Sequence, residues 1–491
     1  HIRDGRCPAV VCSAFFKSPC MHACPINMDI PAYTSLLRAG RLNDAYKVLL
    51  KTNPFPGICG RVCNHRCETK CRRSTLDEPL DIKNLKRFIT DNAVRPRVKP
   101  VPVTRREKLA VIGAGPSGLT AAKDLAWMGY HVTVFDQFPK PGGMLRWGIP
   151  AYRLPRDILD GEINDILGLG VELRCNTRVG KDLSWDSLRK DFDALYLAIG
   201  AQKSLFTDLG DPGLDGVWGA IEFLREINLG NTPPVGERVA VVGGGNSAID
   251  AARSALRLGA KVVTILYRRR REDMPAQDEE IRAAVEEGIE IRDLVTPLRV
   301  EGANGHVEKL FCRNMSLGKF DESGRRKPVP KLGDEFVFDA DQVILAIGQE
   351  IDDDRMMEET GVKLTAQGFV EITSGKMTRT EAPMVFAGGD VVSGPDTVVG
   401  AIEAGHRAAI EMDAAIREKN GEPLYTPLEE EIEIPVTPEE EIQETPRICI
   451  VEAGCGERIK DFREVDLGFS KDAAMKEANR CLRCDLAVEG V

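Results

Sequence analysis

Two patterns of apolar positions follow one another along the chain. Between residues 30 and 57 apolar residues recur at helical spacing, with a break at Gly40 and prolines at 54 and 56 that end the pattern; the spacing rests on Leu36, Leu37, Ala45, Val48 and Leu49. From Leu109 to about Ala415, short apolar runs alternate with helical stretches, as in parallel α/β folds. The chain therefore predicts a small helical domain followed by a larger α/β region.

Two stretches poor in apolar residues flank the α/β region. Residues 95–108, RPRVKPVPVTRREK, are basic and rich in proline, and predict a linker after the helical domain. Residues 426–446, TPLEEEIEIPVTPEEEIQETP, are acidic and interrupted by prolines, and predict a solvated linker before a short cysteine-bearing tail.

Composition excludes several classes of protein. The 491 residues are 43% hydrophobic and 29% charged, as in ordinary soluble domains, and no run approaches the roughly 18 apolar residues of a membrane span. The net charge of -10 argues against nucleic-acid binding, and no secretion signal is visible, so we expect a cytoplasmic protein. Because the sequence begins at His1 rather than Met, we also expect a processed product or one part of a longer chain.

The first chemical motif lies at the start of the α/β region. Residues 109–136, LAVIGAGPSGLTAAKDLAWMGYHVTVFD, have the pattern of a strand, a glycine turn, a helix and a second strand. Gly113 permits the tight turn, Gly115 lets the backbone approach a pyrophosphate, and Gly118 permits close packing of the helix on the strand. Asp136 lies at the distance expected for an acid that binds a ribose. The segment predicts a dinucleotide site, with phosphates at the helix N-terminus.

A second copy of the motif follows at residues 238–273. Gly243, Gly245 and Ala248 take the small-residue positions, and Asn246 and Ser247 begin the predicted helix. No acid ends the second strand, and Arg268 and Arg269 follow it directly. Arginines without an acid favour a 2′-phosphate, so this site is interpreted as an NADP(H) site in which Arg268 or Arg269 contacts the 2′-phosphate. The alternative is that the four arginines at 268–271 form a solvated turn.

A third segment is typical of a flavin site. Residues 383–409 contain an apolar strand that ends in Gly388-Gly389-Asp390, a loop and a helix of small residues. Asp390 can accept a hydrogen bond from a ribityl hydroxyl, and the helix that begins at Thr397, Val398 and Val399 directs its positive end toward the flavin. We therefore expect an FAD domain made of residues 105–202 and 335–415, an NADP(H) domain at 203–334 inserted between them, a helical domain at 1–104, and a linker with its tail at 416–491.

The cysteines decide what the helical domain does. Fourteen cysteines without a secretion signal favour metal ligands or redox groups over disulfides. Eight lie between Cys7 and Cys71, four lie between Cys449 and Cys484, and the remaining Cys175 and Cys312 are interpreted as packed thiols. Zinc would suit the first eight equally well as ligands. A redox-inert metal has no evident use beside a flavin domain, so we favour an electron-carrying group.

At this point the chain resembles a known family. The segments GAGPSGL, PGGMLRWGIPAYRLP, GGGNSAID, YRRRREDMPA and FAGGDVV occur in this order behind the cysteines. They are similar to the small subunit of NADPH-dependent glutamate synthase and to the large subunit of NADH-dependent ferredoxin:NADP oxidoreductase, an electron-bifurcating flavoprotein. The resemblance implies two Rossmann-like domains, for FAD and NADP, of the disulfide-reductase-like type, preceded by an α-helical iron–sulfur domain. It also implies that Gly142, Gly143 and Arg153 in the second segment contact the FAD.

In that family the helical domain holds two [4Fe-4S] clusters. Carried over to this sequence, the resemblance assigns Cys20 and Cys71 to the first cluster. Cys7 and Cys12 are the candidates for its other two ligands, although their spacing departs from the C-x2-C-x4-C of the family. We expect these four cysteines to form cluster 1.

The second cluster departs further from the family. The resemblance assigns Cys24, Cys63 and Cys67 to it, but where relatives have a Glu or Gln as fourth ligand this chain has Lys86. An ammonium has no lone pair for iron, so we expect Cys59 to complete cluster 2.

Both ends of the chain carry weaker signals. Cys449, Cys455, Cys481 and Cys484 are interpreted as a third four-thiolate site, for iron–sulfur or zinc. The opening HIRDGRCPAVVC resembles the end of NADH-oxidising flavoproteins of the respiratory-complex-I and bifurcating-hydrogenase kind. It therefore indicates docking to, or fusion with, such a subunit.

These observations favour an electron-transfer flavoprotein subunit. It would exchange hydride between NADP(H) and FAD and pass single electrons through [4Fe-4S] clusters to an NADH-oxidising flavoprotein or a ferredoxin, in an electron-bifurcating hetero-oligomer. No side chain is expected to act as acid or base, and no histidine has an evident acidic partner. The alternatives are the small subunit of glutamate synthase and, from another class, a redox-inactive zinc-binding assembly subunit. A thioredoxin-reductase-like enzyme would need a C-x-x-C motif between residues 203 and 334, where only Cys312 lies.

Overall fold

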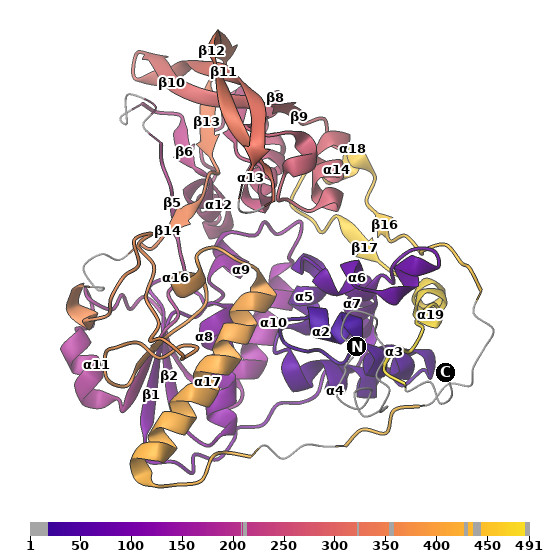
Figure 1. Cartoon of the computed structure of the whole chain (residues 1–491), viewed down its shortest axis with the longest axis vertical. Coiled ribbons are helices and arrows are strands. Elements are labelled where there is room, and N and C mark those ends of the chain that lie inside the picture. Colours follow the sequence, from indigo (N-terminus) through magenta and orange to yellow (C-terminus); the bar gives the residue numbers. More distant parts are fainter. Residues whose placement is uncertain are drawn as a thin grey trace.

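The structure is a computed structural model that describes residues 18–207, 209, 214–321, 324–352, 358–426, 431–435 and 443–486. Figure 1 shows a helical domain and a first α/β domain side by side in the lower half, with a second α/β domain above them. No helix of the described residues is long and apolar enough to cross a membrane.

The helical domain is built from short helices that pack around one apolar core. The predicted periodic segment forms α3 and α4, with Gly40 at a positive φ of 72° between them. Asp29 and Asp81 cap α3 and α7 by accepting hydrogen bonds from Ala32 N and Asn84 N at 3.1 Å each. The helices are α2 (Pro19–Ala23), α3 (Ile30–Arg38), α4 (Leu42–Thr52), α5 (Pro56–Val62), α6 (Arg66–Thr69), η1 (Arg72–Thr75) and α7 (Ile82–Asn92).

The first α/β domain contains a five-stranded parallel sheet with the order β15-β4-β1-β2-β3. β15 comes late in the chain and pairs with β4, so the segment near Asp390 returns to the first Rossmann half. The strands are β1 (Lys108–Ile112), β2 (His131–Phe135), β3 (Glu172–Arg174), β4 (Ala194–Leu197) and β15 (Val385–Ala387). Its helices are α8 (Pro116–Trp127), α9 (Met144–Trp147), α10 (Arg156–Leu167), α11 (Trp185–Asp191), α16 (Asp390–Ser393) and α17 (Val398–Asn420).

The second α/β domain has its own parallel sheet, with the order β6-β13-β7-β8-β9. β13 belongs to this sheet, so the predicted return to the FAD domain at residue 335 is too early. The apolar run at 342–345 resembles β4 because both strands lie beside the first strand of their own domain. The elements are β6 (Val217–Gly219), α12 (Ala220–Leu229), β7 (Arg238–Val242), α13 (Asn246–Arg257), β8 (Val262–Tyr267), η2 (Arg271–Asp273), α14 (Asp278–Glu286), β9 (Glu290–Asp293) and β13 (Gln342–Leu345).

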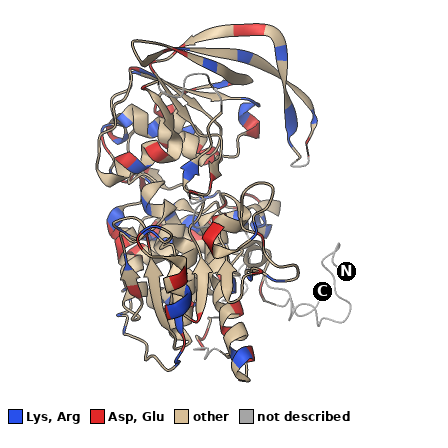
Figure 2. Ribbon diagram, turned by 90° about the vertical axis from the view of Figure 1, so that its left-hand side faces the viewer, with Lys and Arg blue, Asp and Glu red and all other residues tan. Residues whose placement is uncertain are grey.

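Two further sheets connect and extend these domains. The antiparallel pair β5 (Lys203–Ser204) and β14 (Gln349–Glu350) joins the two α/β domains. The arm, which the sequence did not predict, is a three-stranded antiparallel sheet of β10 (Val295–Ala303), β11 (His306–Phe320) and β12 (Arg326–Asp339). Figure 2 shows its long strands curving away from the second α/β domain.

The tail, residues 443–486, returns across the molecule after the acidic segment. It forms β16 (Val451–Glu452), α18 (Cys455–Arg458), β17 (Asp466–Gly468) and α19 (Lys471–Asn479), and β16 pairs with β17. α19 packs against α3 and α7 of the helical domain, whereas α18 lies beside α14 of the second α/β domain (Figure 1). The tail is thus an integral part of the fold.

Candidate functional site

The first glycine turn connects β1 to α8 with the geometry that the motif predicts. A Cβ at Gly113, whose φ is 109°, would lie 2.3 Å from the Ala198 carbonyl oxygen, and one at Gly118 would lie 2.0 Å from the Gly113 carbonyl oxygen. A Cβ at Gly115 would meet no atom closer than 3.8 Å, the distance to the Gly143 Cα. The turn therefore has no room for a side chain at Gly113 and Gly118, where the backbone packs closely. It leaves free space at Gly115, where a phosphate would approach.

Asp136 ends β2 beside this turn. Its carboxylate accepts hydrogen bonds from Ala114 N at 2.7 Å and from Phe138 N at 2.8 Å. Burial raises the pKa of Asp136, and the two amide donors oppose the rise. A cavity of about 470 Å³, including its mouth, lies here, and its lining includes Gly113, Asp136, Val179 and Ile199. The cavity thus lies beside the first glycine turn, where the motif predicts the ribose of a dinucleotide.

The predicted FAD residues of the PGGMLRWGIPAYRLP segment separate into two places. Gly142 donates from its N to the Ala114 carbonyl at 2.8 Å, and Gly143 lies so near Gly115 that an added Cβ would be 2.7 Å from its Cα. Arg153 instead contacts the second α/β domain, pairing with Asp250 at 2.7 Å and with Glu280 at 2.9 Å. The two glycines therefore border the first glycine turn, while Arg153 joins the domains.

The late flavin segment lies at the carboxyl end of β15. Gly389 has a φ of 75°, and a Cβ there would lie 3.1 Å from the Ser117 Cβ on α8. Asp390 accepts a hydrogen bond from Asp396 N at 3.3 Å, and burial raises its pKa to about 6. Thr397 caps α17 by accepting from Gly400 N at 3.2 Å, so Val398 and Val399 form the first turn of this helix. These residues share one edge of the sheet with the first glycine turn.

The second glycine turn connects β7 to α13. A Cβ at Gly243, whose φ is 144°, would lie 2.3 Å from the Ala346 carbonyl oxygen, whereas one at Gly245 would meet nothing within 4 Å. Asn246 and Ser247 begin α13, and the Asn246 Oδ1 accepts a hydrogen bond from Gln277 N at 3.2 Å. As in the first turn, the first glycine has no room for a side chain and the second has free space around it.

Arg268 and Arg269 differ in environment. The Arg269 side chain is buried under the end of the arm, where it donates to Asp321 Oδ2 at 2.6 Å and to the Arg326 carbonyl at 3.0 Å. Arg268 is exposed at the end of β8. The two candidates for the 2′-phosphate contact are therefore not equivalent, because Arg268 is exposed whereas Arg269 is buried and already paired.

Four of the predicted ligands surround one lysine. The inner thiol group consists of Cys24, Cys59, Cys63 and Cys67, and all four thiols interact electrostatically with the ammonium of Lys86, which is only 5% exposed. Burial opposes the charge on Lys86, but the four thiols outweigh it and raise its pKa. Burial raises the pKa of the Cys59 thiol to about 12. The structure thus brings Cys59 to the other three, with Lys86 as a cation among them.

The other cysteines are grouped differently from the sequence prediction. Cys20 and Cys71 line one cavity together with Cys481 and Cys484 from the other end of the chain, and we call these four the terminal thiol group. Cys449 and Cys455 are exposed, and Cys455 donates to the Glu286 carbonyl of α14 at 2.9 Å. The four residues of the predicted third site are therefore not gathered as one set, because Cys455 contacts the second α/β domain whereas Cys481 and Cys484 line a cavity of the helical domain. Cys7 and Cys12 lie outside the described residues.

The two cysteines in the middle of the chain are packed thiols, and one histidine has an acidic partner. Cys312 is fully buried in β11 and Cys175 is half-buried, as packed thiols are expected to be. Among the residues that the structure describes, no three His, Cys, Asp or Glu side chains stand together as a site for a single metal ion. The expectation that no histidine has an acidic partner is wrong for His406, whose Nδ1 lies 2.5 Å from Asp124 Oδ2 and whose Nε2 lies 2.9 Å from the Thr52 carbonyl. Asp124 was missed because it lies on α8, far from His406 in sequence.

Two protein families match the two parts of the chain. Residues 107–405 match the pyridine nucleotide-disulphide oxidoreductases, and residues 5–98 match dihydropyrimidine dehydrogenase domain II, a 4Fe-4S cluster domain. Residues 481–484 lie outside both matches.

Similar proteins cover nearly the whole chain. The beta subunit of NADP(+)-dependent formate dehydrogenase of Moorella thermoacetica is 41% identical over 96% of this chain and 71% of its own length. The beta subunit of NADPH-Fe(3+) oxidoreductase of Geobacter sulfurreducens is 38% identical over 96% of this chain and 75% of its own. The small chain of glutamate synthase [NADPH] of Escherichia coli is 37% identical over 79% of this chain and 87% of its own.

A solved structure shares the fold of the two α/β domains. FprA from Mycobacterium tuberculosis superposes with a TM-score of 0.57 at 18% sequence identity, over 66% of this chain and 87% of its own. The predicted architecture of two Rossmann-like domains behind a helical domain is confirmed.

Proposed function

Because the chain belongs to the family of pyridine nucleotide-disulphide oxidoreductases, we propose that it is an electron-transfer subunit that carries FAD, NADP(H) and two [4Fe-4S] clusters. The observation that carries this proposal is the presence of two open glycine turns and two groups of four thiols in one chain. FAD would accept a hydride from NADPH and release electrons singly, which is what joins a nicotinamide site to iron–sulfur clusters.

Residues of the first α/β domain would hold the FAD. The approach of Gly115 to Gly143 leaves backbone free of side chains beside the N-terminus of α8, which supplies donors and a positive dipole to a pyrophosphate. Asp136 in its cavity would accept from a ribose hydroxyl, and Asp390 from the ribityl chain. The capped N-terminus of α17 would stabilise negative charge on the bound cofactor.

Residues of the second α/β domain would hold NADP(H). Gly245 and the N-terminus of α13 would accept the pyrophosphate, and the exposed Arg268 would contact the 2′-phosphate. Since Arg269 already holds the Asp321 carboxylate, we assign it to the position of the arm.

The inner thiol group would hold one cluster. A buried ammonium is costly unless anions lie beside it, and a cluster with four thiolates supplies that negative charge. Lys86 would therefore act as a counter-charge, and Cys59 as the fourth ligand in place of the Glu or Gln of relatives.

The helical domain would take electrons directly from the FAD domain. Glu162 on α10 accepts from Gly57 N at 2.6 Å and from Ile58 N at 3.1 Å, so it fixes the start of α5, the helix that carries Cys59. His406 on α17, held by Asp124 of the same domain, contacts the helical domain through the Thr52 carbonyl. These contacts would keep the distance between flavin and inner thiol group constant.

Cofactor analysis tests this proposal. Protein prepared without oxygen is expected to contain one FAD and about eight irons per chain, as two [4Fe-4S] clusters require. Fewer than about four irons with stoichiometric zinc would contradict it. Bound zinc is colourless, so a visible spectrum also distinguishes iron–sulfur clusters from zinc.

The proposal extends to the subunit with which this chain assembles. We propose a complex in which a second flavoprotein handles NAD(H) and ferredoxin, so that the FAD of this chain bifurcates electrons. Support comes from the HIRDGRCPAVVC segment and from two relatives that are named as beta subunits. The similarity to the glutamate synthase small chain supports the second candidate, a partner that makes glutamate. Identifying the chains that co-purify from the native host, and assaying them for NADH-and-ferredoxin or glutamine-dependent turnover, separates the two.

A further inference from the structure

The terminal thiol group lies in a cavity between the two ends of the chain. The cavity has a volume of about 370 Å³ including its mouth, and Cys20, Cys71, Cys481 and Cys484 line it together with apolar residues such as Ile30 and Leu80. The thiols also interact with one another electrostatically, Cys20 with Cys71 and Cys484, and Cys481 with all three.

We propose that Cys20, Cys71, Cys481 and Cys484 together bind one [4Fe-4S] cluster, so that the C-terminal tail supplies half of the ligands of the N-terminal iron–sulfur domain. The inference rests on the proposed function, because it assumes that the domain binds iron–sulfur clusters. It differs from the sequence prediction in its ligands, because Cys481 and Cys484 take the places of Cys7 and Cys12. The predicted third site then loses two of its four ligands.

The spacing of the tail cysteines suits this role. Cys481 and Cys484 form a C-x2-C pair, the spacing in which two thiols of one short segment reach the same centre. They follow α19 directly, where Arg483 has a positive φ of 48°. Cys20 and Cys71 come from α2 and from the turn before η1, so three separate segments converge on the cavity.

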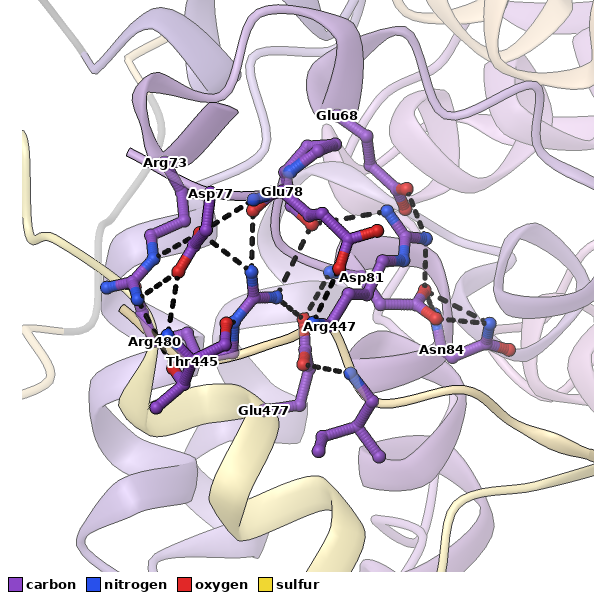
Figure 3. Close-up of polar contacts among 12 residues, drawn as sticks. Glu68, Arg73, Asp77, Glu78, Asp81, Asn84, Thr445, Arg447, Glu477 and Arg480 are labelled. Carbon is purple, nitrogen blue, oxygen red and sulfur yellow. Dashed lines mark hydrogen bonds and ion pairs between the residues drawn. The ribbon is translucent and has the colours of Figure 1, made fainter. Parts of the chain in front are cut away.

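A buried polar network fixes the tail beside the cavity. Arg480, next to Cys481, donates to Asp77 at 3.0 Å and to the Glu78 carbonyl at 2.6 Å, and Arg73, close to Cys71, donates to the same Asp77 carboxylate (Figure 3). Asp77 thus joins Arg480, which is next to Cys481, to Arg73, which is two residues from Cys71.

Glu477 and Arg447 extend this network to α7. Glu477 is fully buried on α19 and accepts from Asp81 N at 2.8 Å, from Ile448 N at 3.0 Å and from Arg480 at 2.7 Å. Arg447 pairs with Glu68 at 2.8 Å and with Asp81 at 3.3 Å, as Figure 3 shows. Buried ion pairs contribute little net stability, but they strongly disfavour arrangements in which a charge loses its partner. They therefore specify where the tail docks.

Arg483 anchors the segment between the two tail cysteines. Its guanidinium donates to the Ser35 hydroxyl of α3 and to the Pro435 carbonyl, and pairs with Asp485 at 2.9 Å. Anchors on both Arg480 and Arg483 hold Cys481 and Cys484 against the helical domain. A tail docked only for stability would not need its two thiols turned to the cavity that Cys20 and Cys71 line.

The test is the double variant Cys481→Ser/Cys484→Ser, prepared without oxygen as the full chain. We expect it to lose about four irons per chain and one of two paramagnetic signals of the reduced protein, while FAD content stays unchanged. Cys449→Ser/Cys455→Ser is the matched control, because it removes two exposed thiols of the same tail and is expected to keep every iron. Cys7→Ser/Cys12→Ser distinguishes the two ligand sets and is also expected to keep every iron.

Three results would overturn the inference: unchanged iron and signals in the Cys481/Cys484 variant, loss of a cluster in the Cys7/Cys12 variant, or zinc bound by the terminal thiol group. If the unaltered protein contains no iron, the proposed function fails instead. A milder variant guards against unfolding, since Cys484→His keeps a possible ligand. It is expected to keep its iron but change the spectrum and potential of one cluster only, and an unaltered spectrum would contradict the inference.

Discussion

The Arg480 guanidinium donates to the Asp77 carboxylate at 3.0 Å, although the two residues come from opposite ends of the chain. Arg480 precedes Cys481 and lies on the tail, whereas Asp77 follows η1 of the helical domain, which begins directly after Cys71. This contact helps to hold the tail cysteines, Cys481 and Cys484, beside Cys20 and Cys71 of the helical domain. The tail therefore docks on the helical domain.

Replacing Arg480 should loosen the tail. Arg480→Met leaves Glu477 without its buried cation and Asp77 with Arg73 alone, and breaking a buried pair from one side costs about 3–5 kcal/mol. We expect amide hydrogen exchange in α19 to rise strongly while exchange in β1 and β7 stays slow. Lys471→Met, at the exposed start of the same helix, is the control. Equal protection of α19 in Arg480→Met and the unaltered protein would mean that apolar packing alone holds the tail.

Replacing Lys86 should lower the potential of one cluster. Its ammonium lies among the inner thiols, so removing it disfavours an added electron by on the order of 2 kcal/mol, or about 90 mV for one electron. Redox titration of Lys86→Met followed by paramagnetic resonance measures the shift. Lys83→Met on the same helix is the control, because Lys83 pairs with Glu279 of the second α/β domain. A shift of both clusters, or of neither, would refute a counter-charge role.

Arg268 and Arg269 should respond differently to removal. A charge-assisted hydrogen bond is worth about 1.5–3 kcal/mol, so Arg268→Ala is expected to weaken NADPH by roughly 10- to 100-fold and to leave NADH unchanged. Arg269→Ala should affect mainly the arm, through its lost contacts with Asp321 and Arg326. Flavin reduction with each nucleotide gives the affinities. If Arg269→Ala produces the NADPH-specific loss, the assignment of the two arginines must be reversed.

The His406–Asp124 pair should make stability depend on pH. Burial opposes the charge on His406, but Asp124 and the Thr52 carbonyl outweigh it and raise the pKa of His406 above its usual 6.5, while the pKa of Asp124 is lowered. A raised folded-state pKa contributes stability that is complete below the unfolded value and is lost as pH rises through the folded value.

The free energy of unfolding should therefore fall as pH rises from about 6.5 through the raised pKa of His406. Denaturant unfolding of His406→Gln across this range should lack that part of the slope. His306→Gln, which removes an exposed histidine of the arm, should retain it. Identical slopes in all three proteins would show that the pair does not titrate in this window.

The two Rossmann motifs were predictable because their chemistry is local. Gly113, Gly115 and Gly118 follow one another within six residues, between a strand and the helix after it. Only the contact that excludes a Cβ at Gly113 comes from farther along the chain, from Ala198 after β4. The grouping of the cysteines was not predictable, because Cys20 and Cys484 meet only through the folding of the tail. Likewise, four consecutive arginines gave no sign that Arg269 would be held by the arm and Arg268 would remain exposed.

The boundary at residue 335 failed for a related reason. The apolar run that forms β13 resembles β4, and the strand pattern does not reveal which sheet accepts it. Lys86 is a different case: its position in place of a Glu or Gln drew attention to Cys59, and the structure places the Cys59 thiol near the same lysine.

The most direct test of the account is a single turnover with NADPH in the absence of oxygen. Flavin absorbance and freeze-quenched paramagnetic resonance would be followed in the same sample, using one NADPH per chain. The account predicts that the flavin is reduced first and that a cluster signal then appears as flavin absorbance partly returns, because electrons pass singly from FAD to the thiol-bound clusters. Reduced flavin that never passes an electron to a cluster, or clusters reduced while the flavin stays oxidised throughout, would contradict it.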